Sequence, residues 1–179
     1  LALVRTNESS CTCGSSCCFF NATAAPEIYT LSLHDALPIY GNWAPDTGNI
    51  LARLLASMKD EHGQVLVEGW YDTAEPLGDE ERAALAAMPD WDRELMRELG
   101  IMRTEGAPQS LPERLLLPAL NVRGITSGNT GSLARNVIPN TAVAALGISL
   151  VLGHEPGHLR PLIVDHIEAQ GFLVVSEVP

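Results

Sequence analysis

Apolar residues recur at helical spacing in two stretches of the chain. The first runs from Ile50 to Met58 and follows Asp46, a residue type that favours the start of a helix. The second runs from Leu159 to Ile167 and precedes Gly171, which favours a helix end. These two patterns predict a pair of amphipathic helices, one in each half of the chain.

Other stretches have the pattern of strands. Short apolar or alternating runs occupy residues 65–67, 120–125, 143–152 and 172–175. The segment at 127–139, between the second and third of these runs, is typical of a loop. The run at 65–67 favours a strand or a hairpin arm.

Residues 79–99 are rich in Ala, Leu, Glu and Arg, and Pro89 interrupts them. This composition predicts two short helices in an exposed insertion at about residues 76–100. We interpret the acidic residues of the insertion as a solvated face.

The order helix, strands, helix, strand fits a split β-α-β unit that lacks its first strand. We therefore predict an α+β, ferredoxin-like fold. A small antiparallel sheet would be covered on one face by the two helices, with the helical insertion attached.

Composition and charge narrow the class of protein. The chain has 179 residues, 46% hydrophobic and 18% charged, which suits one globular domain. Its 11 Lys and Arg against 22 Asp and Glu give a net charge of -11, which repels nucleic acid and anionic membranes. No apolar run is long enough to span a bilayer. We expect a cytoplasmic protein with neither a nucleic-acid nor a membrane partner.

The residues before Tyr40 differ in kind from the rest. Four cysteines gather between Cys11 and Cys18, without the paired spacing of common zinc sites. The stretch from Asn21 to Ile39 resembles the translation of a common sequencing-library adapter, with three differences, at Ala22, Ala25 and Pro26. We expect residues 1–39 to be non-native and disordered or poorly ordered, and we set aside His34 and Asp35 with them.

Two consequences follow for the rest of the chain. The first strand of the sheet is expected to be missing, with Thr30 to Leu33 able to pair there only by chance. Because the chain begins at Leu1, we also expect it to be a fragment of a longer protein.

Three stretches after this point carry a family resemblance. They are Y-G-N-W-A-P at 40–45, S-G-N-T-G-S-L-A-R-N-V-I-P at 127–139 and G-F-L-V-V at 171–175. They resemble the lid, or dimerisation, domain of the zinc exopeptidases that include carnosine dipeptidase, aminoacylase, acetylornithine deacetylase and succinyl-diaminopimelate desuccinylase. The dipeptidase-type members are the most similar. The resemblance implies that residues 40–179 are a lid-domain fragment of a metal-dependent hydrolase.

The resemblance also implies partners and a cofactor. The metal ligands, at a two-metal zinc site, would belong to a catalytic domain absent from this chain, so the fragment would bind no metal and be inactive alone. The lid would close over a peptide or N-acyl amino-acid substrate and pair with a second lid in a homodimer.

Two substrate contacts are implied at numbered positions. Asn136 stands at the position before V-I-P where the family has Asn or Thr, and Ser149 stands where the family has an arginine. A hydroxyl cannot replace the bidentate, charged contact of a guanidinium. Gly147 replaces a usual acidic residue, and a family histidine about four residues before Tyr40 is absent, since His34 lies at another offset.

Other interpretations of these residues stay open. Without the resemblance, Asn136 suits a loop-closing residue whose amide bonds nearby backbone. Arg123 and Arg135 are interpreted as solvated surface charges.

A short motif favours a different class of protein. His154, Glu155 and His158 fit H-E-x-x-H, in which two histidines bind zinc and the glutamate acts as base. This gives an alternative, a free-standing zinc protease, and a non-catalytic interaction module is a third. However, Pro156 and Gly157 favour a turn that begins a helix over the interior of one.

Overall fold

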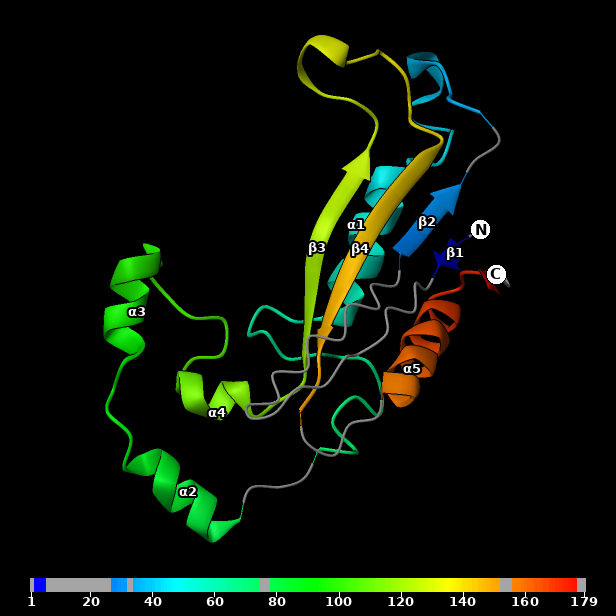
Figure 1. The fold of residues 1–179 in the computed structure, drawn as a ribbon. Helices are drawn as coiled ribbons and strands as arrows, with labels where there is room; N and C mark the ends of the chain where they lie inside the picture. The colour runs from blue at the N-terminus through cyan, green and yellow to red at the C-terminus, as the bar shows by residue number, and fades with distance from the viewer. Residues whose placement is uncertain (1, 6–26, 32–33, 75–77, 152–155, 177–179) are drawn as a thin grey trace, which may run out of the picture.

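The computed structural model of the chain describes residues 2–5, 27–31, 34–74, 78–151 and 156–176. Within these residues, five strands form one sheet in the order β3-β4-β2-β1-β5 (Figure 1). The strands are β1 (Ala2–Arg5), β2 (Glu27–Leu31), β3 (Ala119–Ser127), β4 (Thr141–Ser149) and β5 (Val174–Ser176). The neighbours pair antiparallel, except β1 and β5, which pair parallel.

The α+β class is confirmed, but the exact split β-α-β topology is not, because the sheet contains an extra strand. Strand β1 lies between β2 and β5. Strand β2 fills the position that we expected to be empty, with Glu27 to Leu31 paired to Ala145 to Thr141 of β4. An edge of unpaired backbone groups accepts any extended segment that reaches it, whatever that segment's origin. The proposed origin of residues 1–39 stays a prediction.

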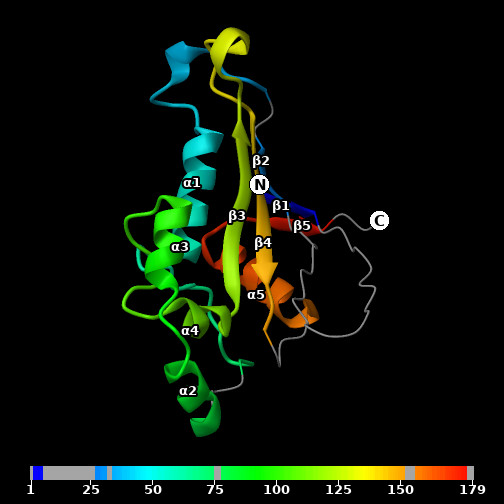
Figure 2. The ribbon, with the colours of Figure 1, turned by 60° about the vertical axis from the view of Figure 1, so that its left-hand side comes forward.

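Two helices cover the sheet as the periodicity predicts. They are α1 (Thr47–Met58) and α5 (Pro156–Ala169). Their apolar residues form one core with alternate residues of β4: Leu51, Leu54, Met58, Leu159, Ile163, Ile167, Ala142, Ala144 and Leu146 are buried. Because alternate residues of a strand share a face, both helices pack on the same face of β4. Figure 2 shows α1 lying along β3.

The start of α1 is fixed by its cap. The Asp46 carboxylate accepts hydrogen bonds from the backbone N–H groups of Gly48 and Asn49, at 2.9 and 3.2 Å. These bonds satisfy donors that have no partner inside the helix.

Residues 65–67 form no strand of the sheet, and of the two predicted alternatives only a short hairpin arm is present. Val65 and Val67 are buried in the core. Val65 forms an isolated antiparallel bridge with Lys59, in which Leu66 N–H donates to Met58 O at 2.8 Å. Val65 N–H donates to the Tyr71 hydroxyl at 3.0 Å. The apolar run therefore closes the end of α1 and contributes no strand to the sheet.

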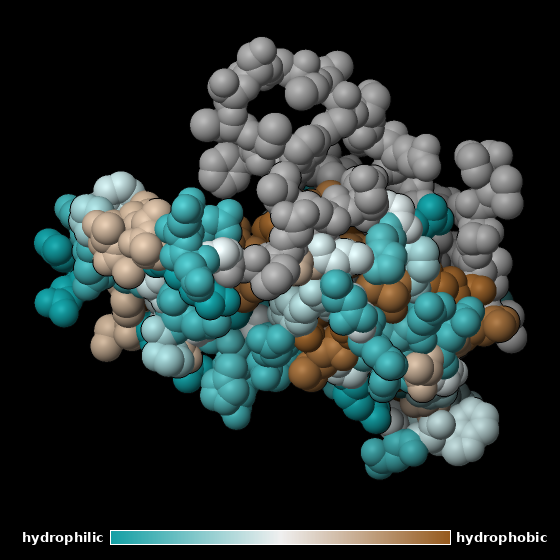
Figure 3. Space-filling view, turned by 90° about the horizontal axis from the view of Figure 1, so that it is seen from below, coloured by the Kyte–Doolittle hydropathy of each residue, from teal (hydrophilic) through white to brown (hydrophobic). Residues whose placement is uncertain are grey.

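The insertion contains α2 (Asp79–Ala86) and α3 (Asp92–Leu99), on either side of Pro89 as predicted, and α4 (Leu111–Leu115) follows it. Helices α2 and α3 stand away from the sheet, and none of their described residues is buried. The surface on their side, seen from below, is mostly hydrophilic (Figure 3). Short 3-10 turns occupy Pro38–Tyr40 and Gly131–Leu133. Among the described helices, none is long and apolar enough to cross a membrane.

Candidate functional site

The loop between β3 and β4 contains the N-V-I-P segment and is held at several points. Ala36 and Ile138 exchange two backbone hydrogen bonds, of 3.0 and 2.8 Å. The hydroxyl of Thr47, at the start of α1, donates to the Pro139 carbonyl at 2.9 Å. The loop is therefore tied both to the segment that follows β2 and to the first covering helix.

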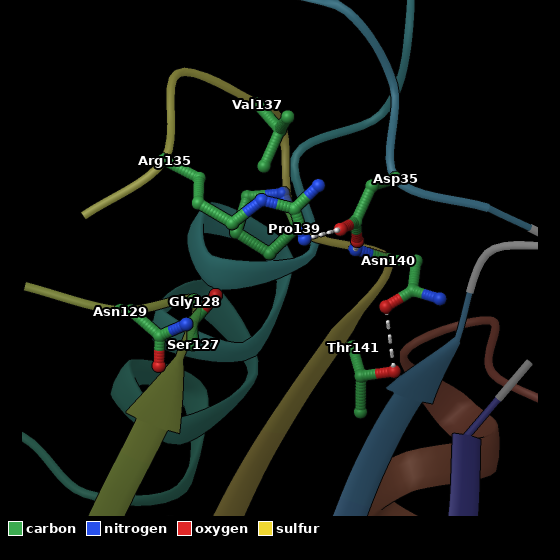
Figure 4. Close-up of a pocket in the computed structure, with 9 residues that line it drawn as sticks. All are labelled: Asp35, Ser127, Gly128, Asn129, Arg135, Val137, Pro139, Asn140 and Thr141. Carbon is green, nitrogen blue, oxygen red and sulfur yellow. Dashed lines mark hydrogen bonds and ion pairs between the residues drawn. The ribbon is translucent and has the colours of Figure 1, made fainter. Parts of the chain in front are cut away.

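A polar cavity of about 310 Å³ lies where this loop meets the ends of β3 and β4 (Figure 4). The Asp35 carboxylate accepts from the Asn140 backbone N–H at 3.0 Å and lies 3.7 Å from the Arg135 guanidinium. The sequence predicts no role for either residue, since Asp35 belongs to the segment expected to be non-native and Arg135 suits a solvated surface charge. No sequence signal paired them, because the contact depends on how the segment after β2 meets the loop.

Asn136 lies at the tip of a three-residue turn, in which Val137 N–H donates to Arg135 O at 3.0 Å. Its side chain is exposed and does not line the cavity. Within the described residues, its amide forms no hydrogen bond, so the turn is closed by backbone groups and not by the Asn136 side chain. The Asn136 amide, which forms no hydrogen bond within the described residues, therefore lies on a turn that backbone hydrogen bonds hold in place.

Ser149 is exposed at the last position of β4, paired with Ala119. Asn136 precedes the first position of the same strand, so the two predicted contacts lie at opposite ends of β4. A strand from Thr141 to Ser149 is roughly 26 Å long, at about 3.3 Å per residue. The structure therefore does not bring these two residues together within one chain.

The H-E-x-x-H alternative receives no support from the structure. His158 is exposed in the first turn of α5, and His154 and Glu155 lie outside the described residues, as do the four cysteines. Helix α5 begins at Pro156, as the Pro-Gly pair predicts. Among the described residues, no group of three or more His, Cys, Asp or Glu side chains is placed to hold a metal ion. No metal-dependent step is assigned to the described residues.

Comparisons with known proteins show what this chain resembles. No protein-family model matches the chain. A Cys-Gly metallodipeptidase of Candida albicans is 26% identical over 134 residues, which are 74% of this chain and 28% of that protein. A Beta-Ala-His dipeptidase of Rattus norvegicus is 28% identical over 124 residues, which are 66% of this chain and 25% of that protein. The chain thus spans about a quarter of the length of these relatives.

A solved structure places the similarity within one family. The M20 family metallo-carboxypeptidase Sso-CP2 from Sulfolobus solfataricus superposes with a TM-score of 0.70 and 25% identity, over 82% of this chain and 39% of that one. The proteins that this chain resembles are therefore metallopeptidases and dipeptidases. More particularly, the relatives and structural neighbours are M20-family members, which confirms the resemblance to the dimerisation domain of a dipeptidase-type member.

Proposed function

We propose that this chain is the lid, or dimerisation, domain of a metal-dependent dipeptidase-like hydrolase. In this proposal the lid closes over the substrate and pairs two subunits, and it has no activity alone. The observation that carries the proposal is the exposed amide of Asn136, which no described residue of the chain uses, on a turn next to the bonds that hold Ile138 and Pro139. Such an amide can donate to an anionic oxygen of a substrate.

The length of β4 supports the pairing of subunits. A dipeptide spans roughly 7 Å when extended, far less than the roughly 26 Å between the ends of the strand. If the Asn136 end and the Ser149 end both contact one substrate, they must therefore come from two chains. A symmetric dimer meets this condition twice, since each substrate receives one end from each lid.

The exposed edge of the sheet offers a surface for such a dimer. Strand β3 is at one edge, and within the described residues it pairs only with β4. Its Val122 and Ile125 side chains are 48% and 60% exposed. Unpaired backbone groups and apolar side chains at a sheet edge favour association with another chain. A second copy of the lid fits the homodimer that the resemblance implies.

The rest of the proposal concerns the parts of the protein outside this chain. The substrate would be a peptide or an N-acyl amino acid, and the protein would be cytoplasmic. A catalytic domain would hold zinc and activate water for hydrolysis of the amide bond. The lid residues would bind and orient the substrate and exclude bulk water.

Hydrolysis assays test this proposal. We expect the 179-residue chain to cleave no dipeptide, with or without zinc, and the complete protein encoded at the source locus to cleave dipeptides. In the complete protein, Asn136→Ala should lower kcat/KM about tenfold or more, as for the loss of a hydrogen bond to a charged group. Gln170→Ala removes an exposed amide from the end of α5 and serves as the control.

Two results would contradict the proposal. Zinc-dependent cleavage by the chain alone, lost on His158→Ala, would favour the free-standing protease. Full activity of the Asn136→Ala protein would remove the substrate role of the loop.

A further inference from the structure

Strand β3 contains a bulge at Arg123. Val122 pairs with Leu146 and Gly124 pairs with Ala145, so Arg123 has no partner of its own on β4. A bulge of this kind changes the direction of the side chain that it carries. Leu146 is buried beneath the helices, and its neighbours Ala145 and Gly147 therefore face the opposite side of the sheet.

The Arg123 side chain lies over Gly147, on the side of the sheet opposite the helices. A Cβ atom built on Gly147 would be 2.9 Å from Arg123 Cδ and 3.0 Å from Arg123 Cγ. These separations are shorter than an ordinary carbon–carbon contact, so this placement of the arginine requires glycine at position 147. Ser149 follows on the same face, roughly 7 Å along the strand. The guanidinium extends beyond Cδ, so the side chain is long enough to bring it near Ser149.

Among the described residues, no anion is paired with the guanidinium. Arg123 is exposed, and within the described residues it forms neither an ion pair nor a hydrogen bond. The resemblance implies an acidic residue at position 147 and an arginine at position 149, a pair separated by one residue on one face. Compared with that pair, Gly147 has neither the bulk nor the negative charge of an acidic residue. Ser149 lacks the positive charge of an arginine.

We propose that Arg123 binds the carboxylate of the substrate at the Ser149 end of β4, in the place of the arginine that Ser149 lacks. Gly147 makes this possible because it leaves room for the side chain and offers it no carboxylate. The guanidinium can then make two parallel hydrogen bonds to a carboxylate, which a serine hydroxyl cannot. The ligand class in this inference rests on the proposed function, since that function implies a peptide with a free carboxylate.

A titration followed by NMR tests the inference on the 179-residue chain. The probe is N-acetylglycylglycine, which has a single charge, and its uncharged C-terminal amide is the control ligand. We expect the acid, and not the amide, to shift the backbone signals of residues 121–123 and 147–149. Arg123→Gln should weaken binding of the acid about threefold to fivefold, the range of an exposed ion pair. Arg93→Gln, an exposed arginine of α3, should leave binding unchanged.

A rescue variant separates this role from a structural one. Adding Ser149→Arg to Arg123→Gln should restore binding of the acid, because the guanidinium returns to the same end of the strand. In a second variant, Gly147→Asp with Arg123 intact, a carboxylate beside the guanidinium should weaken binding of the acid. An Arg123→Gln chain that binds the acid as tightly as the natural chain would overturn the inference, as would failure of Ser149→Arg to restore binding.

The position of the shifts separates this inference from the proposed function. If the acid shifts residues 135–141 but not 147–149, Arg123 has no role, and the carboxylate contact at the Asn136 end stands. If the acid and the amide shift both ends of β4 equally, the lid has no carboxylate site. That result would contradict the inference and the substrate-binding role together.

Discussion

His166 joins the two helices that cover the sheet. Its Nε2 atom lies 2.9 Å from the Ser57 hydroxyl of α1, and partial burial lowers the pKa of the imidazole below its ordinary value. Burial penalises the charged imidazolium, so protonation of this histidine opposes folding. We therefore expect the packing of α1 against α5 to depend on pH.

The sign of the pH dependence follows from the lowered pKa. In the unfolded chain the imidazole binds a proton near its usual pKa of about 6.5, and in the folded chain only at lower pH. The contribution of His166 to stability is therefore present above about pH 6.5 and is lost as the pH falls through the folded pKa. We expect His166→Gln, which keeps a hydrogen-bonding group near Ser57, to flatten the fall in the free energy of unfolding below pH 6.5.

Urea unfolding across the range from about pH 7.5 to pH 5 measures this effect. The control is His62→Gln, which removes an exposed histidine. Equal slopes for the natural chain and the His166 variant would show that burial of this imidazole does not contribute to acid sensitivity.

At the scale of elements, the turn out of β3 depends on one glycine. Gly128 has a φ of 60°, in the left-handed region, and a Cβ atom there would be 2.8 Å from Pro139 Cγ. We predict that Gly128→Ala costs about 1–3 kcal/mol of stability, because the alanine strains the backbone and meets the proline ring. Gly124→Ala is the matched control on β3, since a Cβ atom there meets nothing within 4 Å.

Chemical denaturation of both variants measures the difference. Gly124→Ala should stay within about 0.5 kcal/mol of the natural chain. A Gly128→Ala chain of natural stability would mean that the loop does not hold the conformation described here. Such a loop would also present Asn136 differently.

Elements whose conformation is set locally were predicted well from the sequence. Helix α1 follows from its apolar spacing and the Asp46 cap, and α5 follows from its spacing between Pro156 and Gly171. Strand β2 was not predicted, because its extended conformation is fixed by pairing with β4 and not by its own pattern. The strand predicted at residues 65–67 is absent from the sheet for a related reason. Burial of these residues does not by itself decide where their backbone hydrogen bonds form.

The candidate site was predictable only in part. Asn136 and Ser149 were identified by resemblance, but their placement at opposite ends of β4 required the strand itself. The position of Arg123 over Gly147 depends on the register shift between β3 and β4, which leaves no mark in the sequence. Contacts between distant segments therefore account for what the sequence did not reveal.

At the scale of the whole molecule, β2 joins the two halves of the sheet. It pairs with β4 on one side and with β1 on the other. We predict that residues 40–179 alone are marginally stable and self-associate, because removal of β2 leaves the edge of β4 unpaired. The loss should be several kcal/mol, on the order of about 1 kcal/mol for each hydrogen bond of the ladder.

Thermal unfolding of residues 40–179 beside the full chain, with sedimentation to follow association, measures this loss. The positive control is a chain in which a family-type first strand replaces residues 1–39. This chain should be more stable than residues 40–179 alone. Equal midpoints and clean monomers for the full and shortened chains would show that β2 is not part of the stable fold.

The central claim is that two lids form each substrate site, with the Asn136 end from one and the Ser149 end from the other. Subunit mixing in the complete protein tests it most directly. Asn136→Ala removes one end, and Ser149→Trp blocks the other with a bulky side chain, so each variant alone should keep about a tenth of the natural activity or less. Mixed dimers would contain one intact site, and random pairing should restore about a quarter of the natural activity. No recovery on mixing, with both variants folded and dimeric, would contradict the claim.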